Sequence, residues 1–316
     1  MLLLLEGPDG GGKTTLAKSV FSHLRYVHNG PLTTTDPTEM FWEQLRNLVP
    51  NDGTSVVVDR SWPSEMIYGR LANRPVVFDR AADRMFQRVL LGEGGTTIIC
   101  LPDEQRCREV WRARADRGLE LLTKDEDFAQ MYQFYRGWLD ANRDVAAHWD
   151  YGSMSTGDLL CQVGYRRYPR CPPGVLGSQM AKVLVVGEQA NVKRQPAWAA
   201  GMPFVSPGGS SKTITQWLDE MGLGEHQLCW TNALGPSGIQ SNPAVIQELP
   251  CVVAILALGL TAASWAEQAR RFARTRKITL CPATHPAAWT RFRAGQPWDG
   301  LAFEKILRFA AEHGWC

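Results

Sequence analysis

The most constraining feature of this sequence is a glycine-rich stretch at residues 7–14, which directly follows an apolar segment. The stretch reads Gly-Pro-Asp-Gly-Gly-Gly-Lys-Thr, and the apolar segment Met1–Leu5 is predicted to be a buried strand. Small residues at this spacing let the backbone turn so that successive N–H groups point at phosphate oxygens. A helix predicted over Thr14–Leu24 would direct its positive N-terminal end at the same anions. Together these features predict a phosphate-binding loop for a nucleoside triphosphate.

The polar residues that end this loop have expected roles. Lys13 supplies a mobile cation for the phosphates, and Thr14 supplies a hydroxyl for Mg²⁺. A purely structural glycine-rich turn would leave the Lys-Thr-Thr run unexplained. The predicted cofactors are therefore ATP and Mg²⁺. The residues expected to contact ATP are Gly7, Asp9, Gly10, Gly12, Lys13, Thr14 and Thr15.

Length and composition limit the class of protein. A chain of 316 residues exceeds what one hydrophobic core usually organises, so two domains are expected. The formal net charge of +2 argues against a strongly basic nucleic-acid protein and against an acidic one. Eight cysteines without a C-x-x-C pair argue against a zinc site or a disulfide scaffold, and favour a reducing cytoplasm. No apolar run approaches the roughly 20 residues of a membrane helix, so no membrane association is expected.

Alternating strand and helix patterns predict an α/β protein with two domains. Residues 1–160 are expected to form a parallel sheet covered by helices, residues 161–174 a linker rich in Pro, Gly and Arg, and residues 175–316 a second α/β sandwich without a phosphate loop. The other expected strands are Ser55–Val58, Thr96–Leu101, Lys182–Val186, Gln227–Asn232, Val252–Leu258 and Ile278–Cys281. The other expected helices are Phe41–Leu48, Pro63–Leu71, Ala81–Leu91, Glu104–Arg114, Phe128–Ala147, Ser211–Met221, Pro243–Leu249, Thr261–Phe272 and Phe303–His313.

An acid and an arginine follow the predicted strand Ser55–Val58. Because ligands in such sheets lie beyond the carboxyl ends of the strands, Asp59 and Arg60 are expected near the phosphate loop. Asp59 can organise Mg²⁺ or accept the proton of an attacking hydroxyl, and Arg60 can clamp a transferred phosphoryl group. The structural alternative is a helix-capping aspartate followed by a surface arginine.

Three further arginines, Arg112, Arg114 and Arg117, lie before Gly118. An arginine-rich lid that closes over a triphosphate would exclude water and stabilise negative charge on the phosphoryl group. A solvated helix face is the alternative interpretation. The candidate catalytic residues are Lys13, Asp59, Arg60, Arg112 and Arg117, and the candidate metal ligands are Thr14 and Asp59.

The first domain resembles the thymidylate kinases. Residues 6–15 are similar to the E-G-x-D-G-x-G-K-T-T loop of that family, and Asp59-Arg60-Ser61, followed by Ser64 and Tyr68, is similar to its D-R segment. The resemblance implies that Asp9 holds an acceptor hydroxyl, that the D-R pair lies at the transferred phosphate, and that the chain pairs as a homodimer. Thr35 stands where the family has an arginine for the acceptor's monophosphate. This departure argues against free thymidylate as the acceptor, because a dianionic phosphate would lose its main bidentate partner.

The second domain resembles the uracil-DNA glycosylase superfamily. Four landmarks occur in the family's order: Val185–Glu188, Gly201–Gly209, Trp230–Asn232 and Thr284–Pro286. The resemblance implies a pocket in which Phe204 stacks on a flipped pyrimidine, Asn232 reads its Watson–Crick edge and His285 donates to a carbonyl oxygen, with Glu188 beside them. Taken singly, these side chains are more typical of a core phenylalanine, a turn asparagine and a loop histidine, and it is the ordered set that favours a base pocket.

Two departures in this domain concern glycosidic cleavage. Gly187–Asn191 lacks the Pro-Gly that shapes the water-activating loop of the glycosylases. The cysteines that hold an iron–sulfur cluster in the similar bacterial type are not matched, since the spacing differs at Cys171, Cys229, Cys251 and Cys281. Base recognition is therefore a firmer expectation than base excision.

The two resemblances combined are similar to the phage 5-hydroxymethyluracil DNA kinases of thymine hypermodification. They imply a phage-encoded, ATP-dependent phosphotransferase acting in the host cytoplasm, with two kinds of partner: DNA containing a modified pyrimidine and other DNA-hypermodification enzymes. One alternative is a nucleoside or nucleotide kinase fused to an active uracil-DNA glycosylase. Another is an ATPase joined to a non-catalytic DNA-binding module. All three interpretations keep ATP at the phosphate loop and differ in the acceptor.

Overall fold

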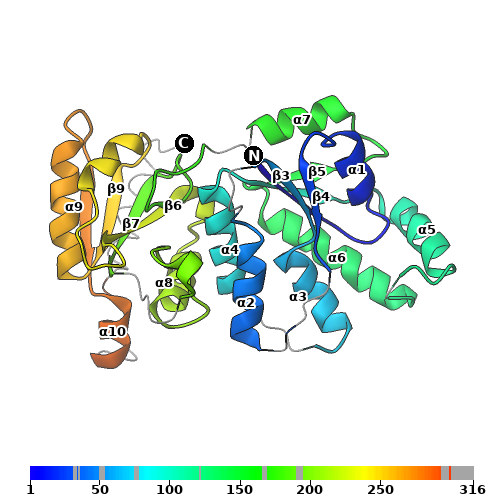
Figure 1. Ribbon diagram of the computed structural model, residues 1–316, viewed down its shortest axis with the longest axis horizontal. Coiled ribbons are helices and arrows are strands. Elements are labelled where there is room, and N and C mark those ends of the chain that lie inside the picture. The colour runs from blue at the N-terminus through cyan, green and yellow to red at the C-terminus, as the bar shows by residue number, and fades with distance from the viewer. Residues whose placement is uncertain are drawn as a thin grey trace. The chain divides into compact units, whose positions relative to one another are not determined.

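The chain is divided into two compact units in the computed structural model (Figure 1). The first unit comprises Met1–Asp79 and Glu93–Tyr168, and the second comprises Arg80–Gly92 and Pro169–Cys316. The structure describes residues 1–30, 34, 36–49, 54–74, 78–120, 122–165, 169–189, 195–292 and 299. The division departs from the contiguous first domain expected from the sequence, because a helix between two strands of the first unit belongs to the second unit.

The sheet of the first unit has five strands in the order β2-β3-β1-β4-β5, and all four neighbouring pairs are parallel. The strands are β1 (Leu2–Glu6), β2 (Arg25–His28), β3 (Val56–Asp59), β4 (Thr96–Cys100) and β5 (Ala146–Trp149). The expected α/β fold with a parallel sheet is thus confirmed. Leu5 of β1 lies opposite Asp59 of β3, so the phosphate loop and the Asp-Arg segment leave the sheet at the same edge.

The helices of the first unit are α1 (Lys13–Ser19), α2 (Pro37–Arg46), α3 (Trp62–Leu71), α5 (Glu104–Ala115), α6 (Asp125–Ala141) and α7 (Thr156–Tyr165). Two of them begin at an aspartate whose side chain caps the backbone. Asp36 accepts from two N–H groups of α2, and Asp103 does the same for α5. Leu16 and Phe21 around α1 pack with Leu5, Val57 and further buried side chains in a core cluster.

Two strands of this sheet differ from the sequence expectation. The pattern over Phe128–Ala147 predicts one helix, whereas the structure ends α6 at Ala141 and begins β5 at Ala146. Because alanine favours helices, the two alanines at the start of the buried strand β5 led to the prediction of a helix there. The edge strand β2 lacks a buried apolar run, which removes the usual strand signal.

The sheet of the second unit has the order β10-β9-β7-β8-β6. Its strands are β6 (Leu176–Gly177), β7 (Val183–Gln189), β8 (Leu228–Leu234), β9 (Ala254–Leu258) and β10 (Thr279–Ala283). The edge strand β6 is antiparallel to β8, and the other pairs are parallel. The carboxyl ends of β7, β8, β9 and β10 therefore lie along one edge of the sheet, where ligands of α/β sheets bind.

Helices cover both faces of this second sheet. They are α4 (Arg80–Gly92), α8 (Gly209–Glu220), α9 (Leu260–Phe272) and α10 (Pro286–Phe292), with short 3₁₀ segments η1 (Ala197–Ala199), η2 (Glu225–Gln227) and η3 (Pro243–Glu248). One core cluster joins the sheet to α9 and η3, and another joins it to α8 and α10. The helix expected over Pro243–Leu249 is thus a 3₁₀ segment, and the one expected over Phe303–His313 lies outside the described residues.

The boundary between the units, between Tyr168 and Pro169, falls within the expected linker of residues 161–174. Residues 161–165 of the expected linker continue helix α7, and residues 166–168 lie outside the described residues. Helix α4 contacts β6, α8 and η2 of the second unit, and the carbonyl of Gly92 accepts a hydrogen bond from the N–H of Cys171. Within the described part of the chain, no helix is both long enough and apolar enough to cross a membrane.

Candidate functional site

The glycine-rich loop connects β1 to α1, and its first carbonyl groups accept hydrogen bonds from the Lys13 side chain. Gly10 and Gly12 have φ angles of 82° and 86°, which side-chain-bearing residues rarely adopt. A Cβ at Gly10 would lie 2.6 Å from the carbonyl oxygen of Cys107, so the loop also packs too closely for a side chain. Lys13 Nζ donates to the carbonyls of Gly7 at 2.6 Å and Pro8 at 2.9 Å. Burial and the nearby Arg60 lower the pKa of Lys13.

A cavity of about 490 Å³, here called the loop cavity, opens above this loop. Six of the seven residues expected to contact ATP line it, namely Asp9, Gly10, Gly12, Lys13, Thr14 and Thr15. Gly7 lies at the start of the loop, where its carbonyl accepts from Lys13. Asp59 and Arg60 line the same cavity, so the structure brings the loop and the Asp-Arg segment together as expected.

Asp59 has the surroundings of a metal- or proton-binding carboxylate. Its side chain is 1% exposed, and its Oδ2 accepts from Thr14 Oγ1 at 3.2 Å and from Tyr26 Oη at 2.6 Å. Its buried Oδ1 has no hydrogen-bond partner within the described part of the chain. An orphaned buried oxygen is costly unless a cation or a proton satisfies it. Mg²⁺ prefers hard oxygen ligands and is usually held by one or two protein groups plus phosphates, so Thr14 and Asp59 fit this ion.

Arg60 is held in a strained backbone conformation. Its φ of 73° is unusual for a residue with a side chain, and its N–H donates to the carbonyl of Leu5 at 3.0 Å. Its guanidinium pairs with Asp9 and lies 4.6 Å from the ring centroid of Tyr68. Burial would raise the pKa of Asp9, but Arg60 and Lys13 outweigh it and hold that pKa below its ordinary value. Asp9 is therefore a charged anchor for Arg60.

The three lid arginines take different positions around α5. Arg114 lines the loop cavity and pairs with Glu120, whereas Arg112 pairs with the exposed Asp125. Among the described residues that line the cavity, neither Arg112 nor Arg117 is found. Val110 lines the cavity one turn before Arg114, so residues four apart share the face toward it. Of the three arginines, Arg114 is the one found among the described residues that line the loop cavity, and the catalytic roles expected for Arg112 and Arg117 stay predictions.

A further cavity of about 290 Å³, the adjoining cavity, shares Asp9, His28, Arg60 and Arg114 with the loop cavity. Its other polar lining includes Gln44, Ser64, Tyr68, Arg74 and Glu120. Sequence reasoning missed several of these residues and also missed Tyr26, because they lie on the edge strand, on helix faces and in loops without a motif. The site of Thr35, which marks the departure from the thymidylate kinases, lies outside the described residues.

Glu6 joins the end of β1 to the start of α3. It is fully buried and accepts from Ser61 N–H at 2.5 Å, from Ser64 Oγ at 2.7 Å and from Tyr135 Oη at 3.2 Å. Burial raises the pKa of Glu6 to about 7, against the lowering effect of Ser64 and the nearby cations. This carboxyl therefore anchors the segment that carries Arg60.

The second unit has its own cavity of about 680 Å³ at the carboxyl ends of its parallel strands, here called the edge cavity. All four residues expected to bind a base line it: Glu188 at the end of β7, Phe204 in a loop, Asn232 in β8 and His285 after β10. They come from separated segments of the sequence, so their convergence supports the expected pocket. Ala190 and Asn191, at the end of the segment Gly187–Asn191 singled out in the sequence, lie outside the described residues.

Gly187 lets the two central residues of this cavity approach the strand. A Cβ at Gly187 would lie 2.5 Å from the ring edge of Phe204 and 2.7 Å from the Oδ1 of Asn232. Phe204 has a φ of 54° and its ring packs 5.1 Å from that of Trp230. A flat aromatic surface and an amide are thus held next to each other, as base stacking and edge recognition require.

His285 is positioned as a neutral donor. Its Nδ1 accepts from the N–H of Ala287 at 3.2 Å, which leaves Nε2 as the protonated nitrogen. Burial lowers the pKa of His285, and the nearby Glu188 opposes this shift. A neutral imidazole with Nε2–H can donate to a carbonyl oxygen.

Comparison with solved structures finds likenesses of low identity and low TM-score over about half of the chain. The YorR protein from Bacillus subtilis, crystallised with phosphorylated GDP, is 16% identical, with a TM-score of 0.42 over 52% of this chain and 94% of that one. Deoxyadenosine kinase from M. mycoides with bound dCTP is 16% identical, with a TM-score of 0.33 over 52% and 98%. Polyphosphate Kinase 2 from Arthrobacter aurescens TC1 is 17% identical, with a TM-score of 0.36 over 52% and 64%. No protein-family model matches the chain, and neither does any curated protein. At such low similarity these likenesses assign no activity, so the function is argued from the residues of the sites.

Proposed function

We propose that this chain is an ATP-dependent kinase that phosphorylates the hydroxymethyl group of 5-hydroxymethyluracil in DNA, and that the edge cavity captures the pyrimidine. The observation that carries the kinase assignment is the buried Asp59, which holds the Thr14 hydroxyl beside the phosphate loop and keeps one oxygen without a partner in the described structure. A P-loop alone is typical of nucleotide binding. A carboxylate at this position adds a group for phosphoryl transfer.

The proposed reaction uses groups that line the loop cavity. The acceptor hydroxyl oxygen bonds to the γ-phosphorus of ATP, the bond from that phosphorus to the β,γ-bridging oxygen breaks, and ADP leaves. The Asp59 carboxylate takes the hydroxyl proton, while Lys13, Arg60 and Arg114 stabilise the negative charge of the transferred group. Thr14 and Asp59 would hold Mg²⁺, which would neutralise charge on the phosphates.

Recognition of a base is supported by the contents of the edge cavity. Phe204 supplies a stacking face, the Asn232 amide can both donate and accept, and His285 Nε2–H can donate to a carbonyl oxygen. A pyrimidine has the matching groups: a flat ring to stack on Phe204, an amide-like edge for Asn232 and a carbonyl oxygen for His285. The absence of Pro-Gly after Glu188 favours capture of the base over its excision.

Mass analysis of the nucleosides released from treated DNA tests this function. Duplex DNA containing 5-hydroxymethyluracil is incubated with the protein, ATP and Mg²⁺, and should yield a nucleoside heavier by one phosphoryl group. Asn232→Ala should reduce this product by about tenfold or more, because it removes a bidentate base contact. ATP binding at the loop cavity should not change. Product formation that is equal in the wild type and in Asn232→Ala would remove the edge cavity from the proposal.

The adjoining cavity favours one alternative function. Its position beside Arg60 and its polar lining, which includes Gln44 and Arg74, also suit a free nucleoside or nucleotide as the acceptor. In that case the chain would combine a nucleotide kinase with a glycosylase domain. Phosphorylation of free nucleotide, or release of free uracil from DNA, would identify this alternative.

A further inference from the structure

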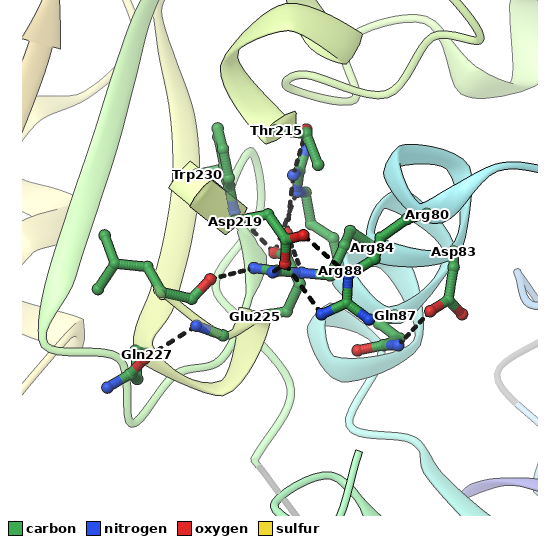
Figure 2. A network of polar contacts seen from close by, with 12 residues as sticks. Arg80, Asp83, Arg84, Gln87, Arg88, Thr215, Asp219, Glu225, Gln227 and Trp230 are labelled. Atoms are coloured by element: carbon green, nitrogen blue, oxygen red, sulfur yellow. Dashed lines mark hydrogen bonds and ion pairs between the residues drawn. The ribbon is translucent and has the colours of Figure 1, made fainter. Parts of the chain in front are cut away.

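Helix α4 directs a row of arginines at the core of the second unit. Arg80, Arg84 and Arg88 recur every four residues and so lie along one face of the helix. Figure 2 shows this face directed at the acids Asp219 and Glu225. The deepest of the three, Arg88, is 0% exposed, as is its partner Glu225. Removing a charged pair from water costs free energy, so the presence of this pair in the core calls for a structural or functional explanation.

Arg88 donates from every nitrogen of its guanidinium group. Nε and Nη2 donate to the two carboxylate oxygens of Glu225 at 3.2 and 2.9 Å, and Nη2 also donates to Thr215 Oγ1 at 2.9 Å. Nη1 donates to the backbone carbonyl of Phe204 at 2.5 Å. The planar group therefore has one orientation, which is set by Glu225 and presented to Phe204.

The same arginine also supports the ring against which Phe204 packs. Its guanidinium carbon lies 3.5 Å from the ring centroid of Trp230, and the indole N–H of Trp230 donates to Glu225 at 3.0 Å. The Phe204 ring packs 5.1 Å from that of Trp230. Arg88 thus fixes Phe204 from two sides, through its carbonyl and through its aromatic neighbour.

The backbone of Phe204 needs such support. Its φ of 54° lies in the left-handed region, which a bulky residue adopts only when its surroundings impose it. An Arg–Glu pair in a core is often no more stabilising than apolar side chains of the same volume. Stability alone therefore does not account for this network, whereas holding a strained residue at the lining of a cavity does.

We propose that Arg88 is a positioning residue of the edge cavity, which holds Phe204 in the conformation that presents its ring to a bound pyrimidine. The proposal rests on the proposed function, because it takes the edge cavity as the base site. Arg88 acts through Phe204 and is not itself among the residues that line the cavity. A segment placed between two strands of the kinase sheet would thereby form part of the base site.

Arg88→Lys tests this role, with Arg84→Lys as the matched control. Lysine keeps the charge but cannot reach Glu225, Thr215 and the Phe204 carbonyl at once. Arg84 is also on α4 and is 4% exposed. It contacts Asp219, the Leu223 carbonyl and, with Nε at 3.4 Å, Glu225, but within the described structure it makes no hydrogen bond to Phe204. Affinity for a single-stranded oligonucleotide with one 5-hydroxymethyluracil should fall about tenfold or more in Arg88→Lys, the loss expected for a charge-assisted hydrogen bond. It should stay near the wild-type value in Arg84→Lys.

The outcomes separate the positioning role from the proposed function. If Asn232→Ala binds this oligonucleotide as tightly as the wild type does, the base assignment fails, and the role of Arg88 in base binding fails with it. If Asn232→Ala loses affinity while the two lysine variants bind equally, the proposed function stands and only the positioning role is overturned. ATP affinity, measured on the same samples, should be unchanged in both lysine variants.

A ligand-free measurement tests the positioning directly. Fluorine NMR of protein labelled with 4-fluorophenylalanine, with the Phe204 signal assigned by its loss in Phe204→Leu, reports the surroundings of that ring. The signal should shift or broaden in Arg88→Lys and not in Arg84→Lys, and identical spectra would contradict the proposal. Should Arg88→Lys fold poorly, Arg88→Gln combined with Glu225→Gln removes both charges of this fully buried pair together and allows the same comparison.

Discussion

Arg60 and Phe204 share an unusual property at the scale of single residues. Three non-glycine residues of the described chain have positive φ, and two of them line the loop cavity and the edge cavity. The third, Asn73, is of a residue type that tolerates this conformation. Each strained residue costs on the order of 1–3 kcal/mol, so it persists only where neighbours impose it. Each of the two cavities therefore has a lining residue whose backbone conformation is imposed by its neighbours.

Glu6 should make the first unit less stable as the pH rises. The folded-state pKa of about 7 lies above the ordinary 4.5, so the stabilisation is complete below about pH 4.5 and is lost as the pH rises through 7. This shift corresponds to a loss of roughly 2 kcal/mol between pH 5.5 and pH 8. Urea denaturation at these two pH values measures it. Glu6→Gln keeps the acceptor for Ser61 N–H and should remove most of the difference; a variant as pH-dependent as the wild type would show that another group is responsible.

At the scale of elements, helix α5 distinguishes two arginines that the sequence treats alike. Arg114 faces the loop cavity, while Arg112 pairs with Asp125 on an exposed surface. Arg114→Ala should lower kcat for phosphoryl transfer by about a hundredfold, the effect of removing one group that stabilises transition-state charge. Arg112→Ala should change kcat by less than about fivefold, because exposed ion pairs contribute little. Equal losses in steady-state kinetics would indicate a lid that rearranges on binding.

The sequence could predict the central elements and the motifs, but not the edges of the sheets or the partners of the site residues. Val56–Asp59 and Thr96–Cys100 are buried on both faces, so their apolar runs predict buried strands. The edge strand Arg25–His28 has no such run, and with it the contact of Tyr26 with Asp59 was missed. No sequence motif points to Arg88, because its contacts depend on helix α4 packing with residues of the second unit that are far away in the sequence.

At the scale of the whole molecule, the second unit depends on a helix from the middle of the first unit's sequence. A fragment of residues 169–316 lacks Arg88 and Arg84, which leaves Glu225 buried without its cations. An uncompensated buried charge costs about 3–5 kcal/mol, so the fragment should be insoluble or should melt well below the full chain. Calorimetry of both proteins measures this.

A spliced chain provides the matched control for that fragment. The Gly92 carbonyl accepts from the Cys171 N–H at 3.0 Å, so a short Gly-Ser linker can join residues 80–92 to residues 171–316. The spliced chain should recover a cooperative thermal transition and binding to the 5-hydroxymethyluracil oligonucleotide. A stable fragment without residues 80–92 would contradict the dependence on α4.

The central claim, a kinase whose acceptor is a base in DNA, is tested most directly by transfer of label from γ-radiolabelled ATP in the presence of Mg²⁺. Thymidylate, deoxyuridylate, ordinary DNA and DNA containing 5-hydroxymethyluracil are offered side by side, with Lys13→Ala as the inactive control. We predict label only on the modified DNA, and none with Lys13→Ala. Label on a free nucleotide, or release of phosphate without any labelled acceptor, would contradict the account.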